Sequence, residues 1–159
     1  MEQKNIDLPF LRLCLELARS AELAGEVPVG ALVVNNHSGE IVARASNLRE
    51  SLCSPIGHAE VIAIHRASRK LGRWRLSGHT LYSSLEPCVM CSGVILQARL
   101  DRVVFSALDP KGGGQSLFGL LEDDRLNHRV DWDWGQLEQE NKAMLKAFFR
   151  LKRQKPKKT

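Results

Sequence analysis

The chain has 159 residues, of which 43% are hydrophobic and 26% are charged. This length suits one domain, and this composition excludes intrinsic disorder for most of the chain. No apolar run reaches the roughly 20 residues that a membrane-spanning helix needs, and residues 1–7 are polar without a secretory signal. We therefore expect a cytoplasmic protein with no membrane contact, in which the four cysteines are core, metal-binding or catalytic residues rather than disulfides.

The net charge of +5 hints at a polyanionic partner. Six basic residues lie close to the C-terminus, and this clustering fits either a solvated tail or a salt-sensitive contact with nucleic-acid phosphates. We predict one domain over residues 1–151, followed by a flexible basic tail over residues 152–159. The basic residues are Arg150, Lys152, Arg153, Lys155, Lys157 and Lys158.

Hydrophobic periodicity predicts helices that alternate with strands along the chain. Helical spacing of apolar residues from Leu11 to Ala21 indicates a first amphipathic helix, and two β-like segments around the turn-rich stretch 35–39 indicate a hairpin. The Gly-rich segment 109–115 is expected to be a loop, with a flexible turn at Gly112–Gly114. The predicted helices are 8–24, 58–70, 88–98, one or two turns at 117–121, and 136–151; the predicted strands are 29–34, 40–46, 80–84, 102–107 and 129–134.

This alternation predicts an α/β fold with three layers, α/β/α. A mixed five-stranded sheet would be covered by helices on both faces, and the hairpin would make one edge of it antiparallel.

Two short motifs carry the chemistry, and each lies where a loop or a strand end becomes a helix. The first contains His58 and Glu60, and the second is Pro87-Cys88-Val89-Met90-Cys91. Two cysteines separated by two residues at a helix start can direct both sulfurs to one ion, and the helix N-terminus favours thiolates. With the imidazole of His58, they form a donor set that suits Zn²⁺.

The number of ligands separates a catalytic from a structural zinc site. Three protein ligands leave one position for water, as in catalytic sites, and the nearby carboxylate of Glu60 can then move protons. The alternative is a closed structural site in which Cys53, from the loop just before His58, supplies a fourth ligand. His65 is a poor candidate because it lies two helical turns beyond His58, roughly 10 Å away.

These motifs are the signature of zinc nucleobase deaminases, and the chain resembles bacterial tRNA adenosine deaminases over roughly residues 8–153. The resemblance implies a cytidine-deaminase-like fold, one Zn²⁺ per subunit and a homodimer. It implies deamination of adenosine to inosine at the wobble position of a tRNA anticodon, with release of ammonia. The segments that carry it are Glu26–Ala31, Leu85–Cys91, Arg102–Phe105, Asp109–Lys111, Leu126–Val130 and Phe148–Arg150.

The resemblance also implies a role for individual residues. The zinc ligands would be His58, Cys88 and Cys91, and Glu60 would be the catalytic proton shuttle. The remaining residues would bind the substrate. Asn47 would hydrogen-bond the flipped base, and Val29 with Pro28 would form the wall of the base pocket. Asp109 and Lys111 would belong to a loop that meets the anticodon stem-loop.

The sequence departs from the family where RNA would be held. Leu108 stands where an arginine is frequent, Ile56 replaces a more polar residue, and the glycine loop is short. An alternative is therefore a deaminase of a free purine base or nucleoside such as guanine, which would act without RNA. A zinc-stabilised RNA-binding module without catalysis is a third possibility, but such a module would have no need of Glu60.

Overall fold

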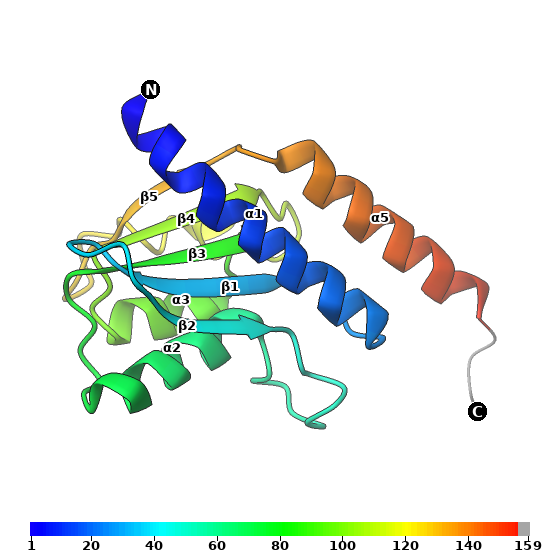
Figure 1. The fold of residues 1–159 in the computed structure, drawn as a ribbon, viewed down its shortest axis with the longest axis horizontal. Helices are drawn as coiled ribbons and strands as arrows, with labels where there is room; N and C mark the ends of the chain where they lie inside the picture. Colours follow the sequence, from blue (N-terminus) through cyan, green and yellow to red (C-terminus); the bar gives the residue numbers. More distant parts are fainter. Residues whose placement is uncertain (156–159) are drawn as a thin grey trace.

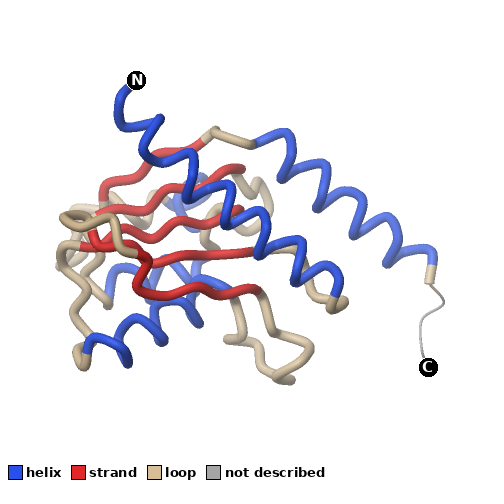
Figure 2. Tube along the Cα trace, in the orientation of Figure 1, coloured by secondary structure: helices blue, strands red, loops and turns tan. Residues whose placement is uncertain are grey.

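The computed structural model describes residues 1–155. In this part of the chain, helices cover both faces of a five-stranded sheet (Figures 1 and 2). The strands are β1 (Gly30–Asn35), β2 (Ile41–Ser46), β3 (His79–Leu85), β4 (Arg102–Ala107) and β5 (Asp131–Trp134). The helices are α1 (Glu2–Leu23), α2 (Ala59–Leu71), α3 (Val89–Gln97), α4 (Gly114–Phe118) and α5 (Glu138–Gln154).

The sheet has the strand order β2-β1-β3-β4-β5. β1 runs antiparallel to both β2 and β3, whereas β3, β4 and β5 are mutually parallel. The mixed sheet with an antiparallel hairpin edge is therefore confirmed. Because of these directions, β2, β3 and β4 all end at the same edge of the sheet, and β1 begins there. Residues that flank these strand ends are brought together although they are far apart in sequence.

The central strands contribute to two cores because successive side chains point to opposite faces. Leu81 and Phe105 belong to the larger core, which α2 and α3 cover. Tyr82 and Val104 lie on the other face and pack with Leu11 of α1. Figures 1 and 2 show α1 and α5 together on this second face. The predicted three-layer arrangement is thus confirmed.

Helix α1 begins at Glu2, six residues before the predicted start. The prediction missed this turn because the first residues carry no apolar pattern. They are held instead by Asp7, which is 1% exposed. Its carboxylate accepts hydrogen bonds of 2.8 Å from the Tyr82 hydroxyl and from both terminal nitrogens of Arg102. A polar network thus anchors the N-terminal turn to β3 and β4.

This network should make stability depend on acid pH. Burial alone would raise the pKa of Asp7, but the hydrogen bonds from Arg102 and Tyr82 outweigh it and hold the pKa below its ordinary value of 3.8. The stabilisation is therefore complete above pH 3.8 and is lost as the pH falls through the lower, folded-state pKa. Asp7→Asn should lower the free energy of unfolding at pH 7 by about 2 kcal/mol. This loss is smaller than the loss on breaking a fully buried ion pair, because the Arg102 side chain is 19% exposed.

Urea unfolding of both proteins between pH 7 and pH 2.5 measures this contribution. The native protein should lose stability more steeply than Asp7→Asn at the acid end, so that the two curves converge. Parallel curves over the whole range would mean that Asp7 does not stabilise the fold through its charge.

Three boundaries near the C-terminus differ from the predictions. Helix α4 starts at Gly114 rather than at residue 117, and β5 starts at Asp131 rather than at residue 129. Helix α5 continues through Gln154, and residues 156–159 of the predicted basic tail lie outside the described residues. The division into a domain over residues 1–151 and a tail stays a prediction. Within residues 1–155, no helix combines the length and the apolar character that a membrane crossing requires.

Candidate metal centre and active site

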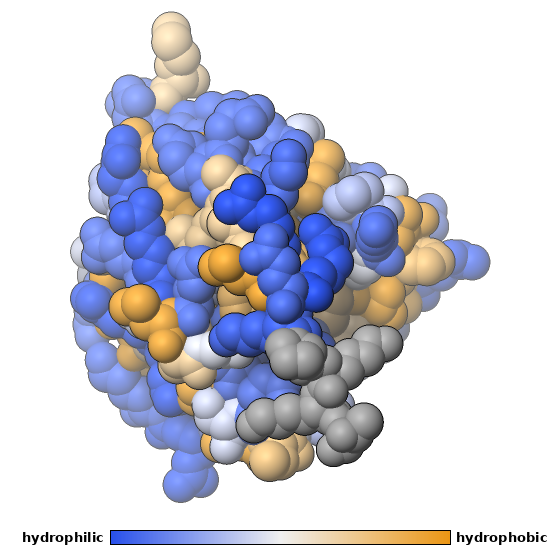
Figure 3. Space-filling view, turned by 90° about the vertical axis from the view of Figure 1, so that its right-hand side faces the viewer, coloured by the Kyte–Doolittle hydropathy of each residue, from blue (hydrophilic) through white to orange (hydrophobic). Residues whose placement is uncertain are grey.

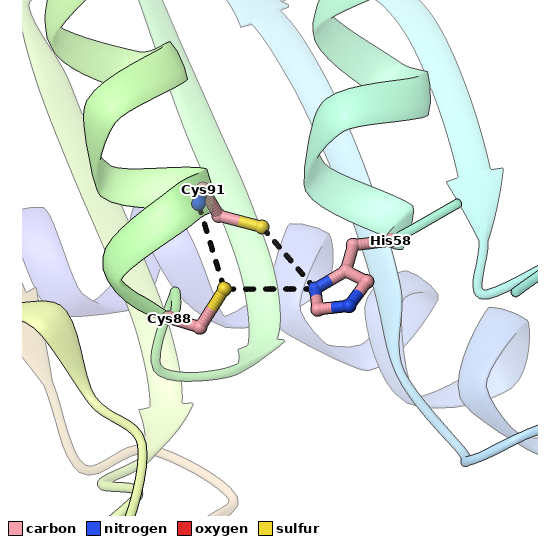
Figure 4. A group of neighbouring side chains, drawn as sticks. All are labelled: His58, Cys88 and Cys91. Carbon is pink, nitrogen blue, oxygen red and sulfur yellow. Dashed lines mark hydrogen bonds between the residues drawn. The ribbon is translucent and has the colours of Figure 1, made fainter. Parts of the chain in front are cut away.

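The three predicted metal donors meet at the sheet edge where β2 and β3 end. His58 is the N-cap of α2 and Cys88 is the N-cap of α3, and the starts of these two helices lie side by side (Figure 4). The Nδ1 atom of His58 lies 3.6 Å from the Cys88 Sγ and 3.5 Å from the Cys91 Sγ. In a tetrahedral site with zinc–sulfur distances of about 2.3 Å and zinc–nitrogen distances of about 2.0 Å, these donors would be about 3.5 Å apart. The geometry therefore fits a zinc ion.

The surroundings of Cys88 favour its thiolate. The backbone N–H of Cys91 points at the Cys88 Sγ from 3.5 Å, at the positive end of the α3 dipole. Hydrogen bonds from the Cys91 thiol and from His58 outweigh burial and lower the pKa of Cys88 to about 4. The hydrogen bond to Cys88 and burial raise the pKa of Cys91. A bound divalent cation would reverse that direction, because a coordinating thiol is deprotonated.

Cys53 does not complete a closed zinc site. It lies exposed in the loop after β2, and its thiol donates to the Glu50 carbonyl at 3.6 Å. Among residues 1–155, the one group of three or more metal-binding side chains consists of His58, Cys88 and Cys91. A set of three donors is typical of catalytic zinc sites.

Glu60 lies in the first turn of α2, directly beside this donor set. It is 4% exposed, and burial raises the pKa of its carboxyl to about 7. Its Oε1 accepts a hydrogen bond from the Ser83 hydroxyl at 3.3 Å, and its Oε2 lies 3.7 Å from the Cys91 Sγ. A carboxyl group that exchanges a proton near neutral pH suits general acid–base chemistry.

A cavity of about 120 Å³ opens beside His58 and Glu60. It is lined by three of the residues predicted to bind substrate, namely Val29, Asn47 and Asp109. This volume is well below the roughly 300–1,000 Å³ of pockets for whole drug-sized ligands. The cavity therefore suits a single ring system rather than a complete nucleotide.

The Asn47 side chain is held in place by the backbone. Its Nδ2 donates to the Val27 carbonyl at 3.2 Å, and its Oδ1 accepts the Arg49 N–H at 3.1 Å. An amide has two donor hydrogens and two acceptor lone pairs, so one of each remains for a ligand. The contact with Arg49 is an Asx turn, and the same side chain also lines the cavity.

The other two predicted residues do not line the cavity. Pro28 is buried next to Val29 in the chain. Lys111 is exposed in the loop after β4, and its backbone N–H donates to the Asp109 Oδ1 at 3.1 Å. The loop reaches the cavity through Asp109, whereas Lys111 is not among the lining residues.

Sequence reasoning missed Glu86, which holds that loop. The buried carboxylate accepts hydrogen bonds from the backbone N–H groups of Asp109, at 2.8 Å, and Ser116, at 2.6 Å. A Cβ atom on Gly113 would lie 2.2 Å from the Glu86 carboxylate, so the glycine is required by close packing. The predicted turn therefore extends no further than Gly112, because Gly113 packs against Glu86 as the N-cap of α4; its flexibility stays a prediction.

A second missed carboxylate, Glu26, holds the loop on the opposite side of the cavity. It is buried, and it accepts hydrogen bonds from the N–H of Ser51 at 2.6 Å and from its hydroxyl at 2.8 Å. The sequence signal for Glu26 was a charged residue directly before the mainly apolar stretch 27–34, which contains β1.

One residue that departs from the family pattern has a structural role in this fold. Leu108 packs against the larger core.

Comparisons with known proteins agree with this geometry. Residues 4–107 match the family model for the cytidine and deoxycytidylate deaminase zinc-binding region. The tRNA-specific adenosine deaminase of Bacillus subtilis is 48% identical over 149 residues, which cover 93% of this chain and 91% of that protein.

Two solved structures extend the comparison. One, from a study of A-to-I editing by tRNA:A34 deaminases, has a TM-score of 0.81 at 38% identity and covers 86% of this chain and 98% of that one. The guanine deaminase of Bacillus subtilis has a TM-score of 0.62 at 27% identity, with 95% and 96% covered. The fold is therefore the predicted cytidine-deaminase-like fold. The chain belongs to the zinc-binding cytidine and deoxycytidylate deaminase family and, within it, to the tRNA-specific adenosine deaminases.

Proposed function

We propose that this protein deaminates adenosine to inosine at the wobble position of a tRNA anticodon, by zinc-dependent hydrolysis that releases ammonia. One observation carries the chemistry: a set of three zinc donors and the buried Glu60 carboxyl meet beside a cavity that suits a single base. The similarity to a tRNA-specific enzyme, at 48% identity, carries the substrate. A free guanine deaminase is the second candidate, because a structure with that activity shares the fold at 27% identity.

In this proposal, His58, Cys88 and Cys91 hold the zinc ion and Glu60 moves the protons. Zinc bound there supplies Lewis-acid activation of water at neutral pH. Glu60 takes one proton from the attacking water and delivers it to the ring nitrogen of adenine. It then takes the second proton from the new C6 hydroxyl and delivers it to the leaving amine. The C6–N bond of the base is replaced by a C6–O bond, and the amine leaves as ammonia.

The walls of the cavity hold the base for this step. Val29, supported by Pro28, packs against the ring, and the free donor and acceptor of Asn47 bind its edge. Asp109 and Lys111, on the loop held by Glu86, contact the RNA around the target nucleotide. A stacked and paired base cannot enter such a cavity, so the substrate is an unpaired loop nucleotide.

The RNA approaches from the side at which the loop after β2 and the end of α5 lie (Figure 1). This face is mainly hydrophilic with scattered apolar groups (Figure 3). Arg150, Lys152 and Arg153 are exposed near the end of α5. Their charges suit contacts with the phosphates of an anticodon stem-loop, and such contacts weaken as salt rises.

Mapping of inosine in synthetic stem-loops tests the predicted position. The zinc-loaded protein should convert adenosine at the wobble position and leave adenosines in the stem and elsewhere in the loop unchanged. Conversion at every unpaired adenosine would contradict specificity for the wobble position, and no conversion in any stem-loop would favour a free-base substrate.

We also propose that the protein is a cytoplasmic homodimer. The cytoplasm keeps the cysteine ligands reduced. A groove of about 650 Å³ on the outer side of α2 and α3 is mainly apolar and includes Val61, Ile64, Val94 and Trp74, which is 61% exposed. Exposed apolar patches of this kind mark interaction sites, and twofold dimers are the commonest oligomers. In sedimentation velocity, we expect a dimer for the native protein and a monomer for Trp74→Glu, because this side chain is exposed and its replacement leaves the core intact. A native monomer at micromolar concentration would exclude the dimer.

A further inference from the structure

We infer that Ser83 is a positioning residue for Glu60: its buried hydroxyl holds one carboxylate oxygen so that the other faces the zinc donors. The inference rests on the catalytic role proposed above for Glu60. It adds a residue that lies outside both sequence motifs and does not line the substrate cavity.

The register of β3 places Ser83 behind the active site. Ser83 pairs with Ala31 of β1 and with Phe105 of β4, in the middle of the sheet. It points to the same face as Leu81, toward α2. It is fully buried, and its Oγ lies 3.3 Å from the Glu60 Oε1. The contact therefore links the floor of the sheet to the start of α2.

The two oxygens of Glu60 have different partners. Ser83 holds Oε1, and Oε2 is turned toward the Cys91 Sγ at 3.7 Å. Among residues 1–155, Ser83 makes the one hydrogen bond from a hydroxyl group to this carboxylate. Without it, the carboxylate could rotate away from the metal donors. A hydroxyl both donates and accepts, so the contact can persist while Glu60 carries a proton.

The neighbouring residue provides a matched control. Ser84 is also fully buried in β3, but it points to the opposite face and its Oγ accepts the Gly30 N–H at 3.0 Å. Removal of either hydroxyl breaks one buried hydrogen bond on the same strand. Only the Ser83 bond reaches Glu60, so a merely structural role would make the two substitutions equivalent.

The experiment compares Ser83→Ala, Ser83→Cys, Ser83→Thr and Ser84→Ala, each loaded with zinc and assayed on a wobble-adenosine stem-loop. Loss of a hydrogen bond to a charged group should lower kcat about tenfold in Ser83→Ala and in Ser83→Cys. KM should stay within about twofold, because Ser83 does not touch the substrate. Ser83→Thr keeps the hydroxyl and should recover most of kcat. Ser84→Ala should lower the Tm but keep the native kcat.

Zinc stoichiometry and Tm, measured on every variant, separate positioning from folding. A native kcat in a folded, zinc-loaded Ser83→Ala or Ser83→Cys would overturn the inference, as would an equal fall in kcat for Ser84→Ala. The catalytic role of Glu60 has its own test in Glu60→Gln. An inactive Glu60→Gln beside a fully active Ser83→Ala would refute only the role of Ser83, whereas an active Glu60→Gln would refute the proposed role of Glu60 itself.

Discussion

Replacement of Glu60 by glutamine should lower kcat by about a thousandfold or more while zinc stays bound. General acid–base catalysis contributes roughly 10²–10⁴-fold, and here one carboxyl group serves every proton transfer. Glutamine has nearly the same shape, so the packing around this buried position should survive. The effect should fall on kcat, because the amide cannot accept and return a proton. Ammonia release at saturating stem-loop, zinc content and Tm are the three measurements.

Glu40→Gln is the matched control. Glu40 is exposed at the hairpin and pairs with Lys70 at 3.1 Å, at the far end of β2 from the active site. This variant should keep its activity, its zinc and its stability, because exposed ion pairs contribute little. If Glu60→Gln loses its zinc, Glu60 acts as a ligand or supports one, and its assignment as proton shuttle is wrong.

Removal of the metal should abolish activity, and Zn²⁺ should restore it. His58, Cys88 and Cys91 form the one metal-binding group of three among the described residues, so loss of a single donor should empty the site. Cys91→Ser should bind less than about a tenth of the native zinc, because a serine hydroxyl is a poor substitute for a thiolate. Its turnover should fall at least in proportion.

Cys53→Ser separates this effect from general cysteine chemistry. Cys53 is exposed and outside the donor group, so this variant should keep one zinc per subunit and full turnover. Equal zinc loss in Cys53→Ser and Cys91→Ser would place Cys53 in the metal site and restore the closed, structural alternative. Full activity of the chelated protein would exclude a zinc mechanism.

Most of the fold was predictable because its elements carry strong periodicity. The boundaries of α2, α3 and β4 lie within one residue of the predictions, since apolar residues and caps mark both ends. The first turn of α1 could not be predicted in this way. Its anchor is the contact of Asp7 with Arg102, two residues that are 95 positions apart in sequence. Such a contact follows from tertiary packing rather than from local pattern.

The active site likewise contains residues that the sequence predicts and residues that only the tertiary structure reveals. His58, Cys88 and Cys91 were predictable because zinc chemistry restricts both residue type and spacing. Glu86 and Ser83 were not, because their importance arises only when β3 is placed in its register beside other segments. The early start of α4 has the same origin, since glycine-rich composition indicated a loop where the Glu86 carboxylate fills the space that a Cβ atom on Gly113 would need.

Ammonia release by the zinc-loaded native protein tests the central claim most directly. The substrates are an anticodon stem-loop with adenosine at the wobble position, free adenosine, guanine and cytidine, each at two salt concentrations. We predict turnover of the stem-loop alone, with an apparent affinity that falls as salt rises because phosphate contacts release counterions. Turnover of guanine, insensitive to salt and with the stem-loop inert, would contradict the tRNA substrate and leave only the zinc chemistry.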